Sequence, residues 1–303
     1  MFRKLFLALT ILAVVFTSAC GDDEKSSSEQ KVSSEKKKSP EVKAEPVKPL
    51  FGDTAAQVAR YLNDETDYSV YLAFPKKSSE AFIYNSKKIR SASMIKVFIM
   101  AAVMEKVKNG ELRLDEPIVL EEYEKVGGAG IIAGEASGTE FPLREVMELM
   151  ITYSDNTATN MIIERIGGET INEYLERHGY NDSFLGRKMM SHVALAGNGE
   201  NYSSARDLGV FFTRLYNHQC VDENLDKIMI DFLLKQTDTD CFPAALPDKK
   251  IAHKTGALDD VYDDGGIIYS DAGDAVLVIM TENFTGEENT IQHMKAFARA
   301  VIR

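Results

Sequence analysis

A serine and a lysine three residues apart are the first pair whose types and spacing could do chemistry. Ser93 and Lys96 lie in the stretch SASMIKVFIM, and from Met94 to Met104 every residue except Lys96 is hydrophobic. This pattern predicts a helix that is buried on all sides and begins at or just before Ser93. A lysine in apolar surroundings has a lowered pKa and can act as a base on a serine that shares its helix face. Alone, the pair also fits a helix cap followed by a lysine that reaches solvent.

A second polar group interrupts a helical pattern. Ser154, Asp155 and Asn156 separate an apolar helical stretch from a second predicted helix, which ends at a pair of glycines. Three short polar side chains between buried helices could serve as capping and turn residues. They could also do chemistry, with Ser154 passing a proton and Asn156 donating its amide to a substrate carbonyl.

The third group, Lys254-Thr255-Gly256, ends the predicted strand KIAHKTGA. On an edge strand, the lysine and threonine could face a cleft and hold a substrate carboxylate, and Gly256 would let a ligand approach the backbone closely. Taken alone, the motif also fits a lysine on a solvated edge strand that ends in a turn.

Together and in this order, the three motifs Ser-x-x-Lys, Ser-Asp-Asn and Lys-Thr-Gly resemble the set of the class A β-lactamases and penicillin-binding proteins. Each lies in the expected context: a helix start, an interhelical loop and a strand. The resemblance covers residues 51–303, and LMITYSDNTATNMII is especially similar to the class A pattern. It implies an α+β fold of the β-lactamase and transpeptidase type, with an all-helical subdomain, and a serine hydrolase that forms an acyl-enzyme.

The resemblance also implies a role for each matching residue. Ser93 would be the nucleophile, Lys96 its base, and Ser154 the donor of a proton to the leaving nitrogen. The other implied site residues are Lys254, Thr255 and Gly256 for the substrate carboxylate, Asn156 for the acylamino side chain, the backbone N–H groups of Ser93 and Ala257 as oxyanion hole, Asp155 as a structural anchor, and Asn160 as the residue that fastens the loop at the mouth of the site.

That loop departs from the class A pattern Leu-x-Arg-x-Glu. Leu185 and Arg187 match, but Met189 stands where the class A glutamate positions the deacylating water. A thioether cannot accept a proton from water, so we expect acylation without efficient turnover of lactams. Glu200 is the nearest glutamate downstream, and the resemblance does not align it with this role.

A second departure follows Lys-Thr-Gly. The segment ALDDVYDDGG carries four aspartates and no arginine of the kind that helps many class A enzymes bind the lactam carboxylate. We expect these aspartates to be turn residues on a solvated face. In the alternative, Asp259 and Asp260 form an acidic mouth that favours a substrate with an amino group, such as a peptidoglycan stem peptide.

Strands at both ends of the domain must position these motifs. SVYLAF and EAFIYN predict a hairpin near its start, while KIAHKTGA, GGIIYS and AVLVIMTEN predict strands near its end, followed by an amphipathic helix. We expect one antiparallel sheet of about five strands, built from both chain ends and packed with helices.

The N-terminus predicts export. Arg3 and Lys4 precede a 12-residue apolar run, too short to span a bilayer, and then TSAC, which resembles a bacterial lipoprotein signal with Cys20 as the lipidated residue. A plain secretory signal is the alternative. The expected organisation is a signal peptide at 1–19, a lipidated N-terminus and disordered tether rich in Ser, Lys, Glu and Pro at 20–50, and a catalytic domain at 51–303. We expect lipid anchoring on the extracytoplasmic side of the bacterial membrane.

The composition of the chain disfavours some classes of partner and cofactor. The chain has 47 acidic and 35 basic residues and a net charge of −12, which argues against nucleic acid as a partner. Cys220 and Cys241 could form a disulfide in an exported protein or remain two separate buried thiols. No His or Cys cluster has metal-ligand spacing, so we expect no metal or cofactor, and we expect a monomer.

Three functions fit these features: a slow or lactam-trapping β-lactamase, a D,D-peptidase acting on cell-wall stem peptides, and a non-catalytic envelope lipoprotein. The methionine at the glutamate position argues against an efficient lactamase. The intact Ser93, Lys96, Ser154 and Lys254 argue against a scaffold, because burying a lysine costs stability that chemistry or a satisfied polar network must offset.

Overall fold

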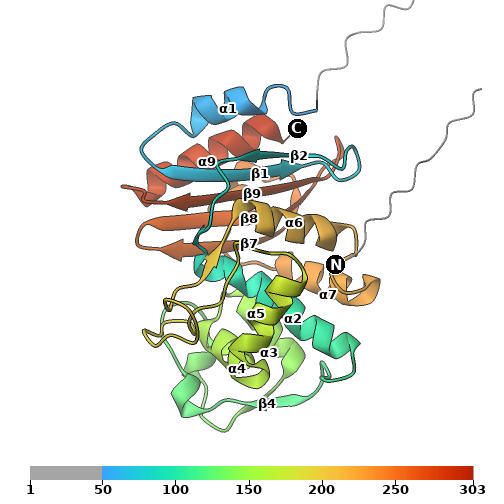
Figure 1. The fold of residues 1–303 in the computed structure, drawn as a ribbon, viewed down its shortest axis with the longest axis vertical. Helices are drawn as coiled ribbons and strands as arrows, with labels where there is room; N and C mark the ends of the chain where they lie inside the picture. Colours follow the sequence, from blue (N-terminus) through green and yellow to red (C-terminus); the bar gives the residue numbers. More distant parts are fainter. Residues whose placement is uncertain (1–49, 303) are drawn as a thin grey trace, which may run out of the picture. The chain divides into compact units, whose positions relative to one another are not determined.

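The computed structural model describes residues 50–302, and its main sheet is built from both ends of that region, as predicted (Figure 1). Five antiparallel strands lie in the order β2-β1-β9-β8-β7. Their bounds are β1 Asp67–Ala73, β2 Ala81–Tyr84, β7 Lys250–Leu258, β8 Val261–Tyr269 and β9 Ala275–Glu282. The α+β prediction is confirmed. The predicted signal peptide, Cys20 and nearly all of the tether lie outside the described residues.

One face of the sheet packs against helices from the two ends of this region. Successive side chains of a strand point to opposite faces, so Val70 of β1 and Ile279 of β9, which are register partners, face the same helical layer. That layer consists of α1 (Thr54–Tyr61), α8 (Phe242–Ala245) and α9 (Glu287–Val301). The helix predicted to close the chain, α9, buries Met294 and Phe297 in it, as its apolar pattern indicated.

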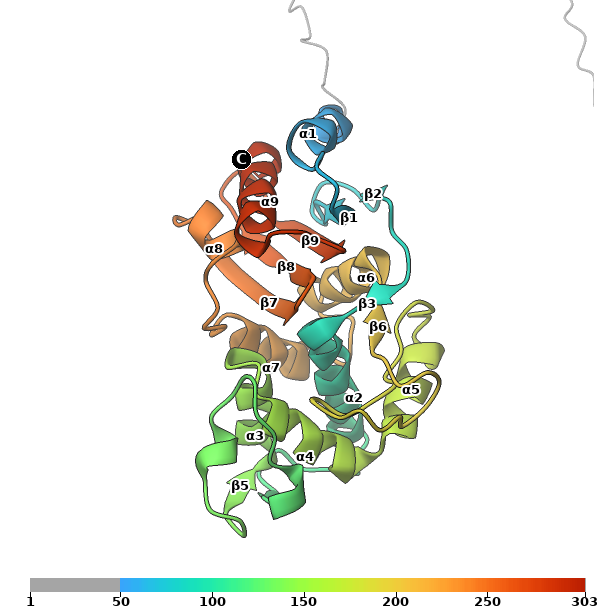
Figure 2. The same ribbon diagram turned by 90° about the vertical axis from the view of Figure 1, so that its left-hand side faces the viewer.

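The other face packs against α6 (Ala205–Tyr216) and the helical half of the molecule (Figure 2). Tyr71 of β1 and Val278 of β9, again register partners, belong to this second core. Gly209 of α6 lies directly on the ring of Tyr71, and a Cβ atom at this position would overlap the ring. The absence of a side chain at Gly209 therefore sets how closely α6 approaches the sheet.

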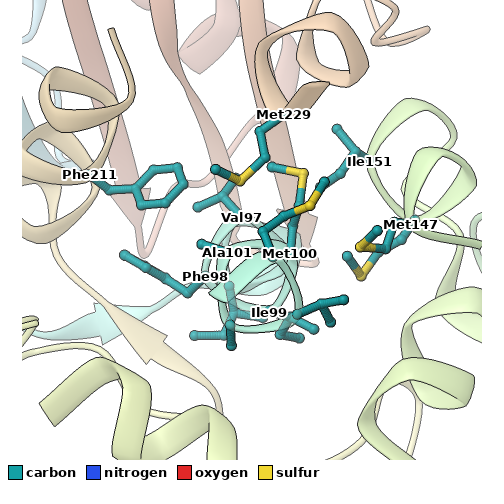
Figure 3. Close-up of a cluster of buried hydrophobic side chains, with 14 of the residues drawn as sticks. Val97, Phe98, Ile99, Met100, Ala101, Met147, Ile151, Phe211 and Met229 are labelled. Atoms are coloured by element: carbon teal, nitrogen blue, oxygen red, sulfur yellow. The ribbon is translucent and has the colours of Figure 1, made fainter. Parts of the chain in front are cut away.

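The apolar stretch after Ser93 forms the central helix of the helical half. It begins as a 3-10 turn, η1 (Ala92–Ile95), and continues as α2 (Lys96–Lys108). All nine residues from Lys96 to Met104 are buried. Figure 3 shows Val97, Phe98, Ile99, Met100 and Ala101 of this helix among the side chains of Met147, Ile151, Phe211 and Met229. A helix that is apolar all round is stable here because other helices cover it on every side.

The remaining elements surround α2 or border the site. The helices are α3 Leu143–Thr152, α4 Asn156–Ile166, α5 Gly168–Arg177 and α7 Glu223–Leu233, with 3-10 turns η2 Glu122–Glu124 and η3 Ile132–Gly134. Two small antiparallel pairs join β3 Ile89–Arg90 to β6 Tyr202–Ser203 and β4 Pro117–Val119 to β5 Glu140–Pro142. No helix in residues 50–302 is long and apolar enough to cross a membrane.

The two cysteines of the described region are not paired. Cys220 lies in the helical core and Cys241 in the core on the opposite face of the sheet, and both are free thiols. The disulfide alternative is therefore wrong, and burial raises the pKa of both thiols.

The close packing at Gly209 can be tested by adding one methyl group. Gly209→Ala should lower the free energy of unfolding by about 2 kcal/mol, because Tyr71 is buried and its hydroxyl is held by Thr213 at 3.2 Å, which opposes its displacement. Urea denaturation measures this change. Gly134→Ala, where a Cβ atom would meet nothing within 4 Å, is the matched control and should change stability by less than about 0.5 kcal/mol. Equal stabilities of the two variants would show that the ring moves aside.

Candidate active site

Ser93 is half-buried in the 3-10 turn that precedes the central helix. The turn is held at both ends, because the Ser91 N–H donates to the Asn201 carbonyl at 2.9 Å and the Met94 N–H donates to the Ser91 carbonyl at 2.8 Å. Ala92 has a φ of 42°, in the left-handed region where alanine is strained. The predicted nucleophile therefore sits on a strained turn at the positive end of α2.

Lys96 is fully buried, and its amine lies among oxygen atoms of the Ser-Asp-Asn motif. The Nζ atom donates to the Ser154 carbonyl at 2.6 Å, to Ser154 Oγ at 3.2 Å and to Asn156 Oδ1 at 2.9 Å. Within residues 50–302 it makes no direct hydrogen bond to Ser93, unlike the contact expected from the Ser-x-x-Lys spacing. Burial lowers the pKa of Lys96 well below its ordinary value, and nearby Lys254 lowers it further.

Ser154 Oγ also accepts a hydrogen bond from the second buried lysine. Lys254 Nζ donates to Ser154 Oγ at 3.0 Å and to the Thr255 carbonyl at 2.7 Å. Burial lowers the pKa of Lys254 to about 7, although the carboxylates of Asp238 and Asp264 oppose this shift. One hydroxyl thus lies between two amines whose charged forms are both disfavoured. It can relay a proton from one to the other at neutral pH.

The other two residues of the Ser-Asp-Asn motif fix the loop that faces Ser93. Asp155 caps α4 by accepting from the Ala158 N–H at 2.9 Å, and it also accepts from the backbone of Ile131 and Ile132 at 2.6 and 2.9 Å. Asn156 donates its amide to the Gly127 carbonyl at 3.1 Å. Since each amide nitrogen carries two hydrogens, one donor of Asn156 is left for a substrate.

Gly256 lines the pocket and also lies against the nucleophile turn. A Cβ atom at this position would lie 3.1 Å from the Ser93 nitrogen and 3.2 Å from the Ala92 Cβ. Strand β7 therefore runs directly against the nucleophile turn, and a side chain at residue 256 would fit only if the turn shifted slightly. The glycine thus permits the close approach of the turn to the strand.

These elements enclose a pocket of about 350 Å³. Of the predicted site residues, it is lined by Ser93, Ser154, Asn156, Thr255, Gly256, Ala257 and Met189. Lys96 and Lys254 do not line the pocket themselves, but both donate hydrogen bonds to Ser154 Oγ, and Ser154 lines it. Sequence reasoning did not assign the other polar side chains that line it, which are Tyr153, Arg187, Glu200, Asn201, Gln236, Thr237 and Asp238. No group of three or more His, Cys, Asp or Glu side chains within residues 50–302 could hold a metal ion.

The loop around Met189 is fastened as the resemblance implied. The Asn160 amide donates to the Met189 carbonyl at 3.2 Å and accepts from the Met189 N–H at 2.8 Å. Met189 is buried, whereas Met190 is exposed and has a φ of 58°. Glu200, which the resemblance did not align with the deacylating role, lines the pocket and forms an ion pair with Arg187.

The prediction for the four aspartates is wrong for two of them. Strand β8 begins at Val261, so Asp263 and Asp264 lie in it and are fully buried. Asp264 bonds to His253 Nδ1 at 2.8 Å and accepts from the Phe242 N–H at 3.0 Å. This buried pair stands directly beside Lys254 in the sheet. The sequence contains both partners, a histidine in β7 and an aspartate in β8. Only the register of the two strands in the folded sheet brings their side chains together.

The other two aspartates lie in the turn between β7 and β8. Asp260 forms an ion pair with Arg90 at 2.8 Å, and Arg90 also binds Glu282 at 2.8 Å. Only Asp259 is an exposed carboxylate of the four. Arg90 therefore neutralises Asp260, so that of the two aspartates in the alternative of an acidic mouth only Asp259 keeps an unpaired charge within residues 50–302.

The lowered pKa of Lys254 makes stability depend on pH in a definite direction. An unfolded lysine stays protonated up to about its ordinary value of 10.5, whereas folded Lys254 is protonated only below about 7. The unfolded state binds more protons between these values, so this lysine makes the folded state less stable as pH falls from 10 to 7. As pH falls through this window, the free energy of unfolding of the wild type should decrease, relative to that of Lys254→Met, by up to about 1.4 kcal/mol per pH unit. Below the window this difference should not change further.

Chemical denaturation of both proteins from pH 6 to 10 tests this dependence. Lys227→Met, on the exposed surface of α7, is the matched control and should show no such slope. A difference between wild type and Lys254→Met that is constant across the window would mean that folded Lys254 keeps its charge.

Comparison with known proteins supports the same family. The beta-lactamase enzyme family model matches residues 53–303. Beta-lactamase SME-1 of Serratia marcescens is 25% identical over 212 residues, which cover 68% of this chain and 72% of that protein. A beta-lactamase of Streptomyces fradiae is 28% identical over 206 residues, covering 64% of this chain and 66% of that protein.

Solved structures share the fold. A beta-lactamase from Sphaerobacter thermophilus superposes with a TM-score of 0.76 at 29% identity, covering 83% of this chain and 96% of its own. PBP-A superposes with a TM-score of 0.76 at 24% identity, covering 85% and 97%. The match over almost the whole described region, together with the arrangement of the three motifs around one pocket, shows that this chain belongs to the beta-lactamase enzyme family.

Proposed function

We propose that the protein is an exported serine hydrolase that is acylated by β-lactams at Ser93 and releases the product slowly. The observation that carries the proposal is the position of Ser154 Oγ, within hydrogen-bonding distance of both buried lysines and in the wall of the pocket that contains Ser93. D-alanyl amides of cell-wall peptides present the same kind of carbonyl to this site. The lipid anchor at Cys20 belongs to the proposal as well.

The proposed acylation step balances its protons through these groups. Neutral Lys96, directly or through Ser154, takes the proton of the Ser93 hydroxyl as Ser93 Oγ bonds to the lactam carbonyl carbon. The ring C–N bond then breaks, and Ser154 gives its proton to the nitrogen and regains one from a protonated lysine. Backbone N–H groups of Ser93 and Ala257 would stabilise the oxyanion.

Slow release follows from the side chain that lies at the loop position. Met189 lines the pocket and offers only a weak acceptor, which cannot take a proton from an attacking water. The intact acylation residues beside this methionine favour a protein that accumulates acyl-enzyme.

Intact-mass spectrometry with benzylpenicillin tests acylation. The protein should gain the mass of one penicillin within minutes and keep it for hours, and Ser93→Ala should gain none, because Ser93 supplies the nucleophilic oxygen. Rapid appearance of free penicilloate without a lasting adduct would instead indicate that another group deacylates the enzyme. No adduct with benzylpenicillin or with a D-alanyl thioester would favour a non-catalytic role.

Replacing Met189 tests the cause of slow release. Met189→Glu places a general base in the pocket wall and should speed loss of the adduct at least about tenfold, below the full effect of a well-positioned base. The decay of the penicilloyl adduct after removal of free penicillin gives this rate. Val193→Glu, which introduces the same charge at an exposed position of the same loop that does not line the pocket, is the matched control and should leave the decay unchanged. Equal decay in all three proteins would show that release is limited elsewhere.

A further inference from the structure

The Arg187–Glu200 ion pair is a charged group in the pocket wall that the proposed acylation does not use. Arg187 Nε donates to Glu200 Oε1 at 3.2 Å, and Nη2 lies 3.1 Å from the same oxygen and 3.4 Å from Oε2. The two side chains are 20% and 25% exposed. A charge pair at this depth is shielded from bulk water but still reachable by a ligand in the pocket.

The backbone around the pair holds it in one place. The Asn201 side chain accepts from the Gly186 N–H at 2.8 Å and from the Arg187 N–H at 3.0 Å, and the Asn201 N–H donates to Glu200 Oε1 at 2.7 Å. A Cβ atom at Gly186 would overlap the Glu200 backbone, so the two ends of the loop touch. The Arg187–Glu200 pair therefore joins the two ends of the loop formed by residues 187–200, and its side chains are held in place without a ligand.

The pair also has unused hydrogen-bonding capacity. A guanidinium has five N–H donors, and Arg187 directs only Nε and Nη2 to Glu200, while Nη1 has no hydrogen-bond partner within residues 50–302. The Glu200 carboxylate accepts three hydrogen bonds and has about four lone-pair positions. One carboxylate and one ammonium of a ligand can thus bind the pair without separating it.

The location indicates which part of a substrate would meet the pair. The loop that carries Arg187 and Met189 also carries Met190, and a Cβ atom on Gly128 would lie 3.4 Å from the Met190 sulfur and 2.8 Å from the Asn156 side-chain nitrogen. The loop therefore borders the part of the pocket that contains Asn156. The substrate carboxylate is expected at Thr255, and the acylamino side chain at Asn156. The side chain of the acyl group is therefore the part directed toward Arg187 and Glu200.

Resting on the proposed function, we infer that Arg187 and Glu200 select substrates whose acyl side chain ends in an amino acid group. The ligand carboxylate would pair with Arg187 and its ammonium with Glu200. A neutral ion pair binds such a zwitterion without leaving a net charge buried, whereas a side chain with a single charge satisfies only one member. A stem peptide that contains a diamino acid with a free amino acid end belongs to this class.

Two penicillins with the same nucleus test the inference. One carries the benzyl side chain and the other an α-aminoadipyl side chain, which ends in a free amino acid group. In the wild type, the second-order rate of acylation should be about fivefold higher for the aminoadipyl compound, the scale of a partly shielded charge contact. Intact mass against time gives both rates. Their ratio is the readout, because a general loss of activity cancels from it.

The contact between the ligand ammonium and Glu200 is tested by one variant and one modified substrate. Glu200→Gln should lower the ratio, because only the carboxylate contact with Arg187 remains, and N-acetylation of the aminoadipyl amine should lower it likewise in the wild type, where no change of fold is involved. A wild-type ratio near one, with both penicillins forming adducts, would overturn the inference and leave the proposed function standing. No adduct with either would overturn the proposed function itself. An unchanged ratio in Glu200→Gln, with a slower loss of adduct, would overturn the inference and make Glu200 a deacylating base.

Discussion

The hydroxyl of Ser154, shared by two buried lysines, is the interaction on which the rest of this site depends. Lys96 and Lys254 come from the central helix and from the edge strand of the sheet, and they meet only at this oxygen. Burial of both amines lowers the pKa of each, and the charge of Lys254 lowers the pKa of Lys96 further. Protons can therefore move among the three groups near neutral pH. This mobility is what a serine needs in order to attack a carbonyl and release an amine.

The fold supplies the apolar surroundings and the close contact that this arrangement requires. An α-helix buried on all sides carries Lys96 into the helical core, where its charge is costly. Strand β7 brings Lys254 to the same point and lies so close to the nucleophile turn that a side chain at residue 256 would fit tightly. The strain at Ala92 and at Ser154, whose φ is 52°, is stored where the sheet and the helical half meet.

The loop that follows α5 determines what happens after acylation. Its backbone is fastened to Asn160 in two hydrogen bonds, so the side chain at position 189 has a defined place in the pocket wall. A methionine at that place removes the acceptor for a water proton, while Arg187 and Glu200 at the neck of the same loop add a neutral pair of charges. In the proposed function, the same short segment thus weakens one step of the reaction and provides a means of choosing the substrate.

Local patterns determined the fold class, the motifs and their elements. Short apolar runs rich in β-branched and aromatic residues at both ends of the domain predicted the sheet, and an apolar helix with one lysine predicted a buried amine, because such patterns are properties of neighbouring residues. Tertiary structure alone decided the contacts between distant segments. The pairing of His253 with Asp264 depends on strand register, and the position of Glu200 in the pocket depends on how the loop closes at Arg187. Which hydroxyl each lysine binds, and the tight contact of Gly256 with the nucleophile turn, likewise follow from the distance between a strand and a helix that are far apart in the chain. No local pattern encodes that distance.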